Sequence, residues 1–183
     1  MSLKYAVLAA LHEQPATGYD LTRNFRTRMA NVWNASHQQI YRELAKMTEE
    51  GLLEVEEVPQ ESRPDRKLYR LSDAGTASLA TWLAEPQGRP PTRDPLLVKL
   101  FGGDLVDPAS LREEIERHRR NWQEELGRYQ DIEAEYFSKP EQVPFRFRLQ
   151  HLALRKGILA MEANLAWADE VAGVLKDELT SRP

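Results

Sequence analysis

One stretch of the chain combines side chains that can read a DNA base edge with the spacing of an amphipathic helix. Between residues 36 and 51, apolar residues recur every three or four positions and would face a protein core. The opposite face carries Gln38, Arg42 and Ala45. Glutamine and arginine can hydrogen-bond base edges in a major groove, and a small alanine allows close approach to the duplex. The pattern predicts a recognition helix.

Further candidate contacts lie at the start of this helix and on its flanks. Backbone N–H groups and short polar side chains at a helix start suit a phosphate or a base edge. Tyr41 would flank the exposed face as a contact, or it would pack its ring on the domain and send only its hydroxyl to a phosphate. The predicted DNA-contacting residues are Tyr19, Ser36, His37, Gln38, Gln39, Tyr41, Arg42, Lys46, Arg63, Arg66 and Lys67.

A hairpin is expected after the recognition helix. Residues Leu52 to Val58 and Lys67 to Leu71 are short runs rich in β-branched, leucine or tyrosine residues, and a long polar loop separates them. The hairpin's basic residues would reach an adjacent phosphate or minor groove, although Glu61 and Asp65 oppose the approach. We therefore expect contacts that position the domain and read little sequence.

Start and stop signals place the remaining elements of the first part. Helices are predicted over residues 3–11, from Thr17 to about Met29, from Ser36 until Gly51 ends the helix, and from Ser72 through Leu83. Thr17 with Asp20, and Ser36 with Gln39, read as capping boxes. Three helices, a two-stranded wing and a closing helix are typical of a winged helix-turn-helix domain.

The composition changes near residues 85–95, where four prolines and a glycine disfavour helix and strand. We predict a DNA-binding domain over 1–88, a linker over 89–94 and a helical dimerisation domain over 95–183. Aspartate-proline pairs at 94–95 and 107–108 signal helix starts. The fold class is thus mainly α, a winged helix followed by a helical domain.

Two long helices are predicted in the second domain, from about Pro108 to Phe137 and from about Phe145 to Leu179. Apolar residues recur along both at alternating spacings of four and three, and such stripes require a partner helix. One helix pair cannot cover all of these residues, so a homodimer is expected. The predicted interface residues are Leu111, Ile115, Trp122, Tyr129, Leu154, Ile158, Met161, Leu165, Ala172 and Leu175.

Composition excludes several classes of site. The chain has no cysteine, which rules out disulfides, thiolate metal sites and cysteine nucleophiles. The four histidines show no ligand spacing, and no phosphate loop or catalytic triad order is visible, so we predict no enzyme, metal or cofactor. No apolar run suits a membrane span or a signal peptide, so a cytoplasmic location is expected.

Charge is distributed unevenly along the chain. The formal net charge is −4, which alone disfavours nucleic acid. Residues 1–48, however, hold six basic and three acidic side chains, a local excess of three positive charges. The acidic excess lies elsewhere, so the first domain retains the potential that phosphate binding needs.

Four motifs in the first domain occur in one order: GYDL at 18–21, QIYREL at 39–44, EGLL at 50–53 and KLYRLSDAG at 67–75. Together they resemble the PadR family of transcriptional regulators. The second domain is similar to the two-long-helix module of that family's larger members. The resemblance implies a DNA-binding regulator that binds a palindromic operator as a homodimer, and we expect it to be a repressor.

A small aromatic effector is a further expectation, since the resemblance implies phenolic acids for some family members. Candidate pocket residues are Trp33, His118, Trp122, His151 and Trp167. The alternative for these tryptophans is an ordinary place in the core or at an interface. The alternative for the whole protein is an interaction adaptor with a degenerate winged helix, which an acidic recognition face would have favoured.

Overall fold

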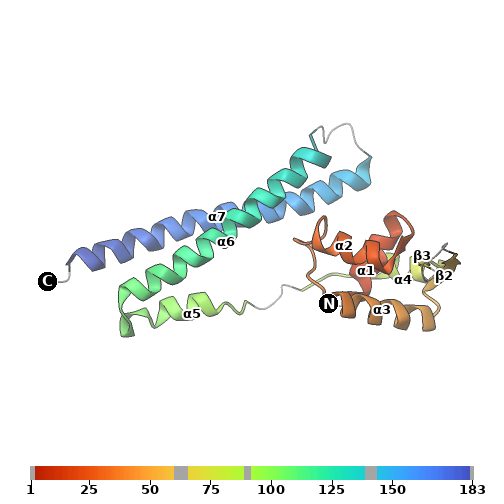
Figure 1. Cartoon of the computed structure of the whole chain (residues 1–183), viewed down its shortest axis with the longest axis horizontal. Coiled ribbons are helices and arrows are strands. Elements are labelled where there is room, and N and C mark those ends of the chain that lie inside the picture. The colour runs from red at the N-terminus through yellow and green to blue at the C-terminus, as the bar shows by residue number, and fades with distance from the viewer. Residues whose placement is uncertain (1–2, 60–65, 89–91, 139–143, 182–183) are drawn as a thin grey trace. The chain divides into compact units, whose positions relative to one another are not determined.

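The computed structural model describes residues 3–59, 66–88, 92–138 and 144–181. The chain divides into two units, residues 1–89 and residues 90–183. Both units are shown in Figure 1. Among the described helices, none combines the length and the apolar composition needed to cross a bilayer.

The first unit has the predicted order of helices and hairpin (Figure 1). Its elements are α1 (Leu3–Glu13), β1 (Ala16–Thr17), α2 (Gly18–Arg26), α3 (His37–Glu49), β2 (Leu53–Val58), β3 (Arg66–Leu71) and α4 (Asp73–Ala84). The winged helix prediction is confirmed, with β2 and β3 paired as the predicted hairpin, and β1 adds a third antiparallel strand in the order β1-β3-β2. A strand of two residues carries too little periodicity to be recognised.

Capping interactions set the start of the recognition helix. The Ser36 hydroxyl accepts from the Gln39 N–H at 3.3 Å, and the Ser36 N–H donates to the Gln39 side-chain carbonyl at 2.8 Å. Gly51 follows the helix with a φ of 71°, in the left-handed region that glycine tolerates. Both predicted signals are therefore confirmed.

The helix before it also begins in a capping box but ends early. The Thr17 hydroxyl accepts from the Asp20 N–H at 3.2 Å. The helix ends at Arg26 and not at about Met29. Thr27 leaves the helical backbone geometry, with φ −115° and ψ −92°, and its N–H is shared between the carbonyls of Arg23 and Asn24. The chain then continues in tight turns that the helical pattern did not reveal.

A single apolar core holds these elements together. Ile40, Leu44 and Met47 of α3 are completely buried, together with Val7 and Leu8 of α1. At about 1.5–3 kcal/mol for each fully buried large apolar side chain, this face of α3 anchors the helix firmly. Burial of the apolar face leaves the opposite face of α3 in solvent.

The described residues of the second unit form four helical elements: α5 (Pro95–Phe101), η1 (Gly103–Leu105), α6 (Pro108–Tyr136) and α7 (Phe145–Ser181). The predicted caps are confirmed, since Asp94 accepts from the Leu96 N–H at 2.9 Å and Asp107 from the Ala109 N–H at 3.0 Å. The two long helices, α6 and α7, run antiparallel and side by side (Figure 1).

The apolar stripes of α6 and α7 pack on each other within one chain, which corrects the reasoning that assigned them to a subunit interface. Six of the ten predicted interface residues are buried there: Leu111, Ile115, Tyr129, Leu154, Ile158 and Leu175. The other four are half-buried: Trp122, Met161, Leu165 and Ala172. A side chain buried in its own chain offers little surface to another, so a subunit contact needs a different face of these helices.

Candidate nucleic-acid interface

The exposed face of α3 presents the predicted base-reading residues together. Gln38, Arg42 and Ala45 are all exposed. Lys46 is also exposed, and its ammonium lies 3.8 Å from Glu50, four residues further along the helix. An exposed pair of this kind contributes little to stability, so the lysine remains able to exchange its partner for a phosphate. This face offers two long hydrogen-bonding side chains beside a small one.

At the start of α3, Ser36 and Gln39 are exposed but occupied by the capping box. They help to orient the helix, and their remaining hydrogen-bonding groups face solvent. His37 stacks on Tyr41 with ring centroids 4.2 Å apart and a tilt of 31°. Two aromatic rings therefore cover the flank of the recognition helix.

Tyr41 packs its ring on the domain, as in one of the two alternatives that the sequence left open. Its ring lies against Gly18 at the start of α2, while 40% of the residue stays exposed. A Cβ atom at Gly18 would lie 2.5 Å from Cζ of Tyr41 and 2.8 Å from its hydroxyl oxygen. A side chain at position 18 would therefore displace the Tyr41 ring, a contact that the sequence alone did not reveal.

A second tyrosine lies near this contact. Burial raises the pKa of Tyr69 on β3, and the nearby Tyr41 raises it further. The Tyr69 phenol therefore stays protonated and neutral at physiological pH. Its pairing opposite Ala16 of β1 and Val55 of β2 shows that it belongs to the middle strand of the wing.

The wing carries alternating charges. Arg66 and Lys67 are exposed on β3, and the Lys67 ammonium lies 3.9 Å from Glu57 on β2. Arg70 pairs with Glu54 at 2.8 Å. Arg63, a predicted contact, lies outside the described residues. Acidic neighbours therefore partly neutralise the described basic side chains of the wing.

Tyr19 lies at the start of α2 and is 60% exposed. Its neighbour Gly18 is buried under the Tyr41 ring. The exposed predicted contacts thus come from three elements: the start of α2, the outer face of α3 and strand β3 of the wing.

The predicted effector residues lie in both units. Trp33 packs against the core of the first unit. In the second unit His118 and Trp122 lie with centroids 5.5 Å apart, and Trp122 meets Trp167 edge-on at 6.2 Å. His151 lies elsewhere, stacked on Phe137 and 2.7 Å from a carboxylate oxygen of Glu133. Within the second unit, therefore, His118, Trp122 and Trp167 come together, whereas His151 lies apart from them.

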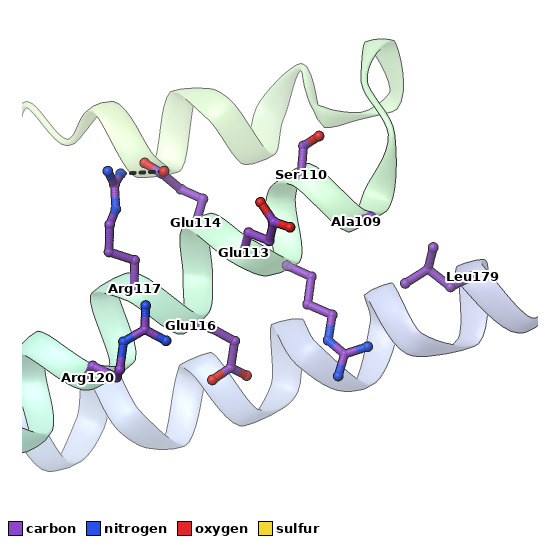
Figure 2. Close-up of a pocket in the computed structure, with 9 residues that line it drawn as sticks. Ala109, Ser110, Glu113, Glu114, Glu116, Arg117, Arg120 and Leu179 are labelled. Atoms are coloured by element: carbon purple, nitrogen blue, oxygen red, sulfur yellow. Dashed lines mark hydrogen bonds and ion pairs between the residues drawn. The ribbon is translucent and has the colours of Figure 1, made fainter.

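Two hollows lie on the described surface of the second unit. One, of about 640 Å³, is lined by three arginines and three glutamates, so its charges balance (Figure 2). Within it Arg117 pairs with Glu114. Hydrogen bonds, first from Lys99 at 2.8 Å and also from Arg117, lower the pKa of Glu114.

The other hollow, of about 560 Å³, lies between η1, the start of α6 and the last turns of α7. Trp167, Val171 and Leu111 contribute apolar walls, and Asp104 and Glu170 are among its acidic residues. In the described residues, no group of three or more histidine, aspartate or glutamate side chains is arranged to hold a metal ion.

Family models cover both units of the chain. Residues 7–81 match the transcriptional regulator PadR-like family, and residues 92–176 match the family described as virulence activator alpha C-term. A probable transcriptional regulator of Mycobacterium tuberculosis is 38% identical over 97% of this chain and 100% of its own length. The chain belongs to the PadR-like family of transcriptional regulators. Its relatives are regulators and not enzymes.

Two solved relatives share the whole architecture of this PadR-like regulator. The Vibrio cholerae virulence activator AphA is 33% identical with a TM-score of 0.81, covering 97% of this chain and 99% of its own. The negative transcriptional regulator PadR of Bacillus subtilis is 31% identical over 73% of this chain and 72% of its own length. Its structure with operator DNA has a TM-score of 0.82 at 25% identity, covering 94% and 98% of the two chains.

Proposed function

We propose that this PadR-like regulator binds a palindromic operator as a homodimer and represses transcription in the cytoplasm. The observation that carries the proposal is the outer face of α3, where Gln38, Arg42 and Ala45 are exposed while the opposite face is fully buried. A helix anchored in this way can present its polar face to a major groove without losing its packing. The operator complex of the Bacillus subtilis relative supports the same use of the fold.

Within this proposal the contacts divide into two kinds. Gln38 and Arg42 would read base edges, whereas Lys46 and the wing residues Arg66 and Lys67 would contact phosphates. The start of α2, with Tyr19 and the Tyr41 hydroxyl beside it, would meet the backbone of the duplex. The acidic partners of the wing limit its contribution to non-specific attraction.

A homodimer is expected from the way in which α3 would read DNA. A single α3 covers only a few base pairs, and helix-turn-helix proteins gain specificity by reading two half-sites about one helical turn apart. Repression is supported by the name of the Bacillus subtilis relative, a negative regulator, although the relative from Vibrio cholerae is named an activator.

The test is selection of operators from random duplex DNA with the full chain. We expect enrichment of an inverted repeat, and footprinting of the protein's own upstream region should protect a matching site. The enriched sequence should be lost in the Arg42→Ala variant. If no sequence is enriched above non-specific binding, the operator proposal is wrong and the adaptor alternative gains support.

We also propose that a small aromatic molecule acts on this regulator through His118, Trp122 and Trp167. The mutual contacts of these rings support a common response to a ligand, and a ligand can regulate only through different affinities for two arrangements of the protein. Titration of the parent and of Trp122→Phe with phenolic acids should change tryptophan fluorescence and release operator DNA in the parent. If neither signal changes, this part of the proposal fails.

A further inference from the structure

The two hollows of the second unit differ in charge. Three arginines and three glutamates line the hollow of about 640 Å³, so its charges balance (Figure 2). The hollow of about 560 Å³ is lined by three acidic side chains, those of Asp104, Glu170 and Glu178. In the part of the chain that the structure describes, no basic side chain lines it. This hollow, which we call the acidic hollow, therefore attracts cations and repels anions.

The acidic side chains come from two different elements. Glu170, Val174 and Glu178 follow one another at intervals of four residues on α7, so they share one face of that helix. Asp104 belongs to η1. Within the described ranges, neither Asp104 nor Glu170 has a basic partner at ion-pair distance. A cation bound in the hollow would be attracted from both elements and would offset the mutual repulsion of the carboxylates.

Most of the remaining lining of the acidic hollow is apolar, and it includes an aromatic ring. Leu111 is buried, Trp167 and Val171 are half-buried, and Val174 is 69% exposed. Tryptophan is the aromatic side chain that attracts an organic cation most strongly, through the negative face of its ring. A largely apolar hollow with a few charged groups is typical of small-molecule sites, whose volumes are roughly 300–1,000 Å³.

A metal ion and a hydrophilic polyamine each fit only part of this lining. Among the described residues, no group of three or more histidine, aspartate or glutamate side chains is arranged to hold a metal ion. Hard metal ions need several oxygen ligands in direct contact, and the apolar walls supply none. A polyamine would satisfy the carboxylates but would leave the apolar walls in contact with polar groups. A ligand with both an apolar body and a positive charge fits the whole lining.

We propose that the acidic hollow binds an apolar organic cation, such as an aromatic or quaternary ammonium compound. Its positive charge lies among the carboxylates of Asp104, Glu170 and Glu178, and its apolar body packs against Trp167 and Val171. The inference goes beyond the proposed function, because the same carboxylates repel the phenolic acids proposed as effectors. A ligand in this hollow contacts η1, α6 and α7 together, so its binding stabilises the second unit.

Two ions of the same shape and opposite charge test the sign of the site. Tetraphenylphosphonium and tetraphenylborate carry the same phenyl rings on a cationic and an anionic centre. Isothermal titration calorimetry of the full chain should show tetraphenylphosphonium binding about ten-fold more tightly than tetraphenylborate. Spermidine, a cation without an apolar body, should also bind about ten-fold more weakly. Equal affinities for the two tetraphenyl ions, or tighter binding of spermidine, overturn the proposal.

Removal of two charges locates the site. The double variant Asp104→Asn with Glu170→Gln should weaken tetraphenylphosphonium binding about ten-fold, because two attractive charges at the hollow are lost. The matched control is Asp177→Asn with Glu162→Gln, which removes the same charges at exposed positions of α7 that do not line the hollow. The control should keep the parental affinity. Equal losses in both double variants overturn the proposal, because the cation then responds only to net charge.

Replacement of the tryptophan tests the aromatic wall. Trp167→Leu keeps an apolar side chain but removes the ring, so it should weaken tetraphenylphosphonium binding about three-fold. Trp167→Phe should restore part of the affinity, because a smaller ring returns. Trp167 also contacts Trp122, so thermal unfolding without ligand checks that each variant is folded. Parental affinity in a folded Trp167→Leu variant overturns the placement of the ligand against this wall.

A second copy of the chain is the competing occupant of the acidic hollow. If a partner subunit filled it, the affinity for tetraphenylphosphonium would fall as the chain concentration rises. We expect an affinity that does not depend on chain concentration, and a fall overturns the proposal. These titrations contain no DNA, so their failure leaves the operator proposal standing. Cation binding by a chain that selects no operator supports this inference and defeats the proposed function.

Discussion

The two units of this regulator differ in how they bury their apolar side chains. In the first unit the apolar face of α3 is fully covered by its own neighbours, with Leu44 at 0% exposure. In the second unit α6 and α7 cover one face of each other, yet Leu159 stays 54% exposed and Phe101 of α5 stays 96% exposed. Exposed apolar surface on this scale marks an interaction site. The DNA-binding unit is thus complete within one chain, whereas the helical unit gains from association.

The largest predicted effect is a difference in stability between two leucine-to-alanine variants, one in each unit. Leu44→Ala removes a buried side chain and leaves a cavity, so the free energy of unfolding should fall by about 2–5 kcal/mol. Leu159→Ala removes an exposed side chain and should change the stability of the monomer by less than about 0.5 kcal/mol. Urea unfolding followed by circular dichroism at low protein concentration measures both. Equal losses would contradict the contrast between the units.

The next effect concerns DNA reading by the first unit. Arg42→Ala should weaken operator binding by about 1–3 kcal/mol, because a base-edge contact is lost, while binding to unrelated DNA changes less. Lys67→Ala should instead weaken binding to all sequences and flatten its salt dependence. Fluorescence anisotropy with operator and scrambled duplexes at several salt concentrations measures both. An Arg42→Ala variant with parental operator affinity would show that another face reads the bases.

A smaller effect should come from the contact between α2 and α3. Gly18→Ala places a methyl group 2.5 Å from Cζ of Tyr41, so the ring must move. Operator affinity should fall by about 1 kcal/mol, the scale of mild overpacking. In a Tyr41→Ala background the same change should cost little, because the clash is absent. A double-mutant cycle of operator affinity tests this coupling. A cycle with no coupling would show that the contact between Gly18 and Tyr41 does not affect DNA binding.

The smallest effect is an acid dependence within the second unit. Hydrogen bonding, first from Lys99, lowers the pKa of Glu114 from its ordinary value of 4.5. Its contribution to stability is therefore present above pH 4.5 and is lost as the pH falls through the lowered value. Over that range the parent should lose more stability than Glu114→Gln, whereas the exposed control Glu113→Gln should follow the parent. Parallel curves of stability against pH for all three proteins would show that the ion pair of Glu114 with Lys99 does not stabilise the fold.

Features that depend on neighbouring residues were predictable from the sequence. The hydroxyl of Ser36 and the amide of Gln39 are three residues apart, so their capping box forms whatever the rest of the chain does. The same holds for Asp107 before Pro108. The faces of α3 were predictable because its buried and exposed residues alternate with the helical period.

Other features depend on residues far apart in the chain and escaped prediction. Strand β1 exists because Ala16 and Thr17 find hydrogen-bonding partners on β3, more than fifty residues away. The approach of Gly18 to Tyr41 depends on how α2 crosses α3. His151 does not lie with the other predicted effector residues of the second unit, because its ring contacts Glu133 and Phe137. Residue spacing alone does not reveal these contacts.

The apolar residues of α7 lie both on its buried face and on its exposed face, and they show what residue spacing predicts and what it does not. The order of residues was sufficient to predict a long helix with an apolar face and its place after the winged helix. Which face α6 would cover was decided only by the tertiary structure, which buries Ile158 and leaves its neighbour Leu159 exposed. Periodicity shows which side chains share a face, but the partner that covers a face depends on packing between distant segments.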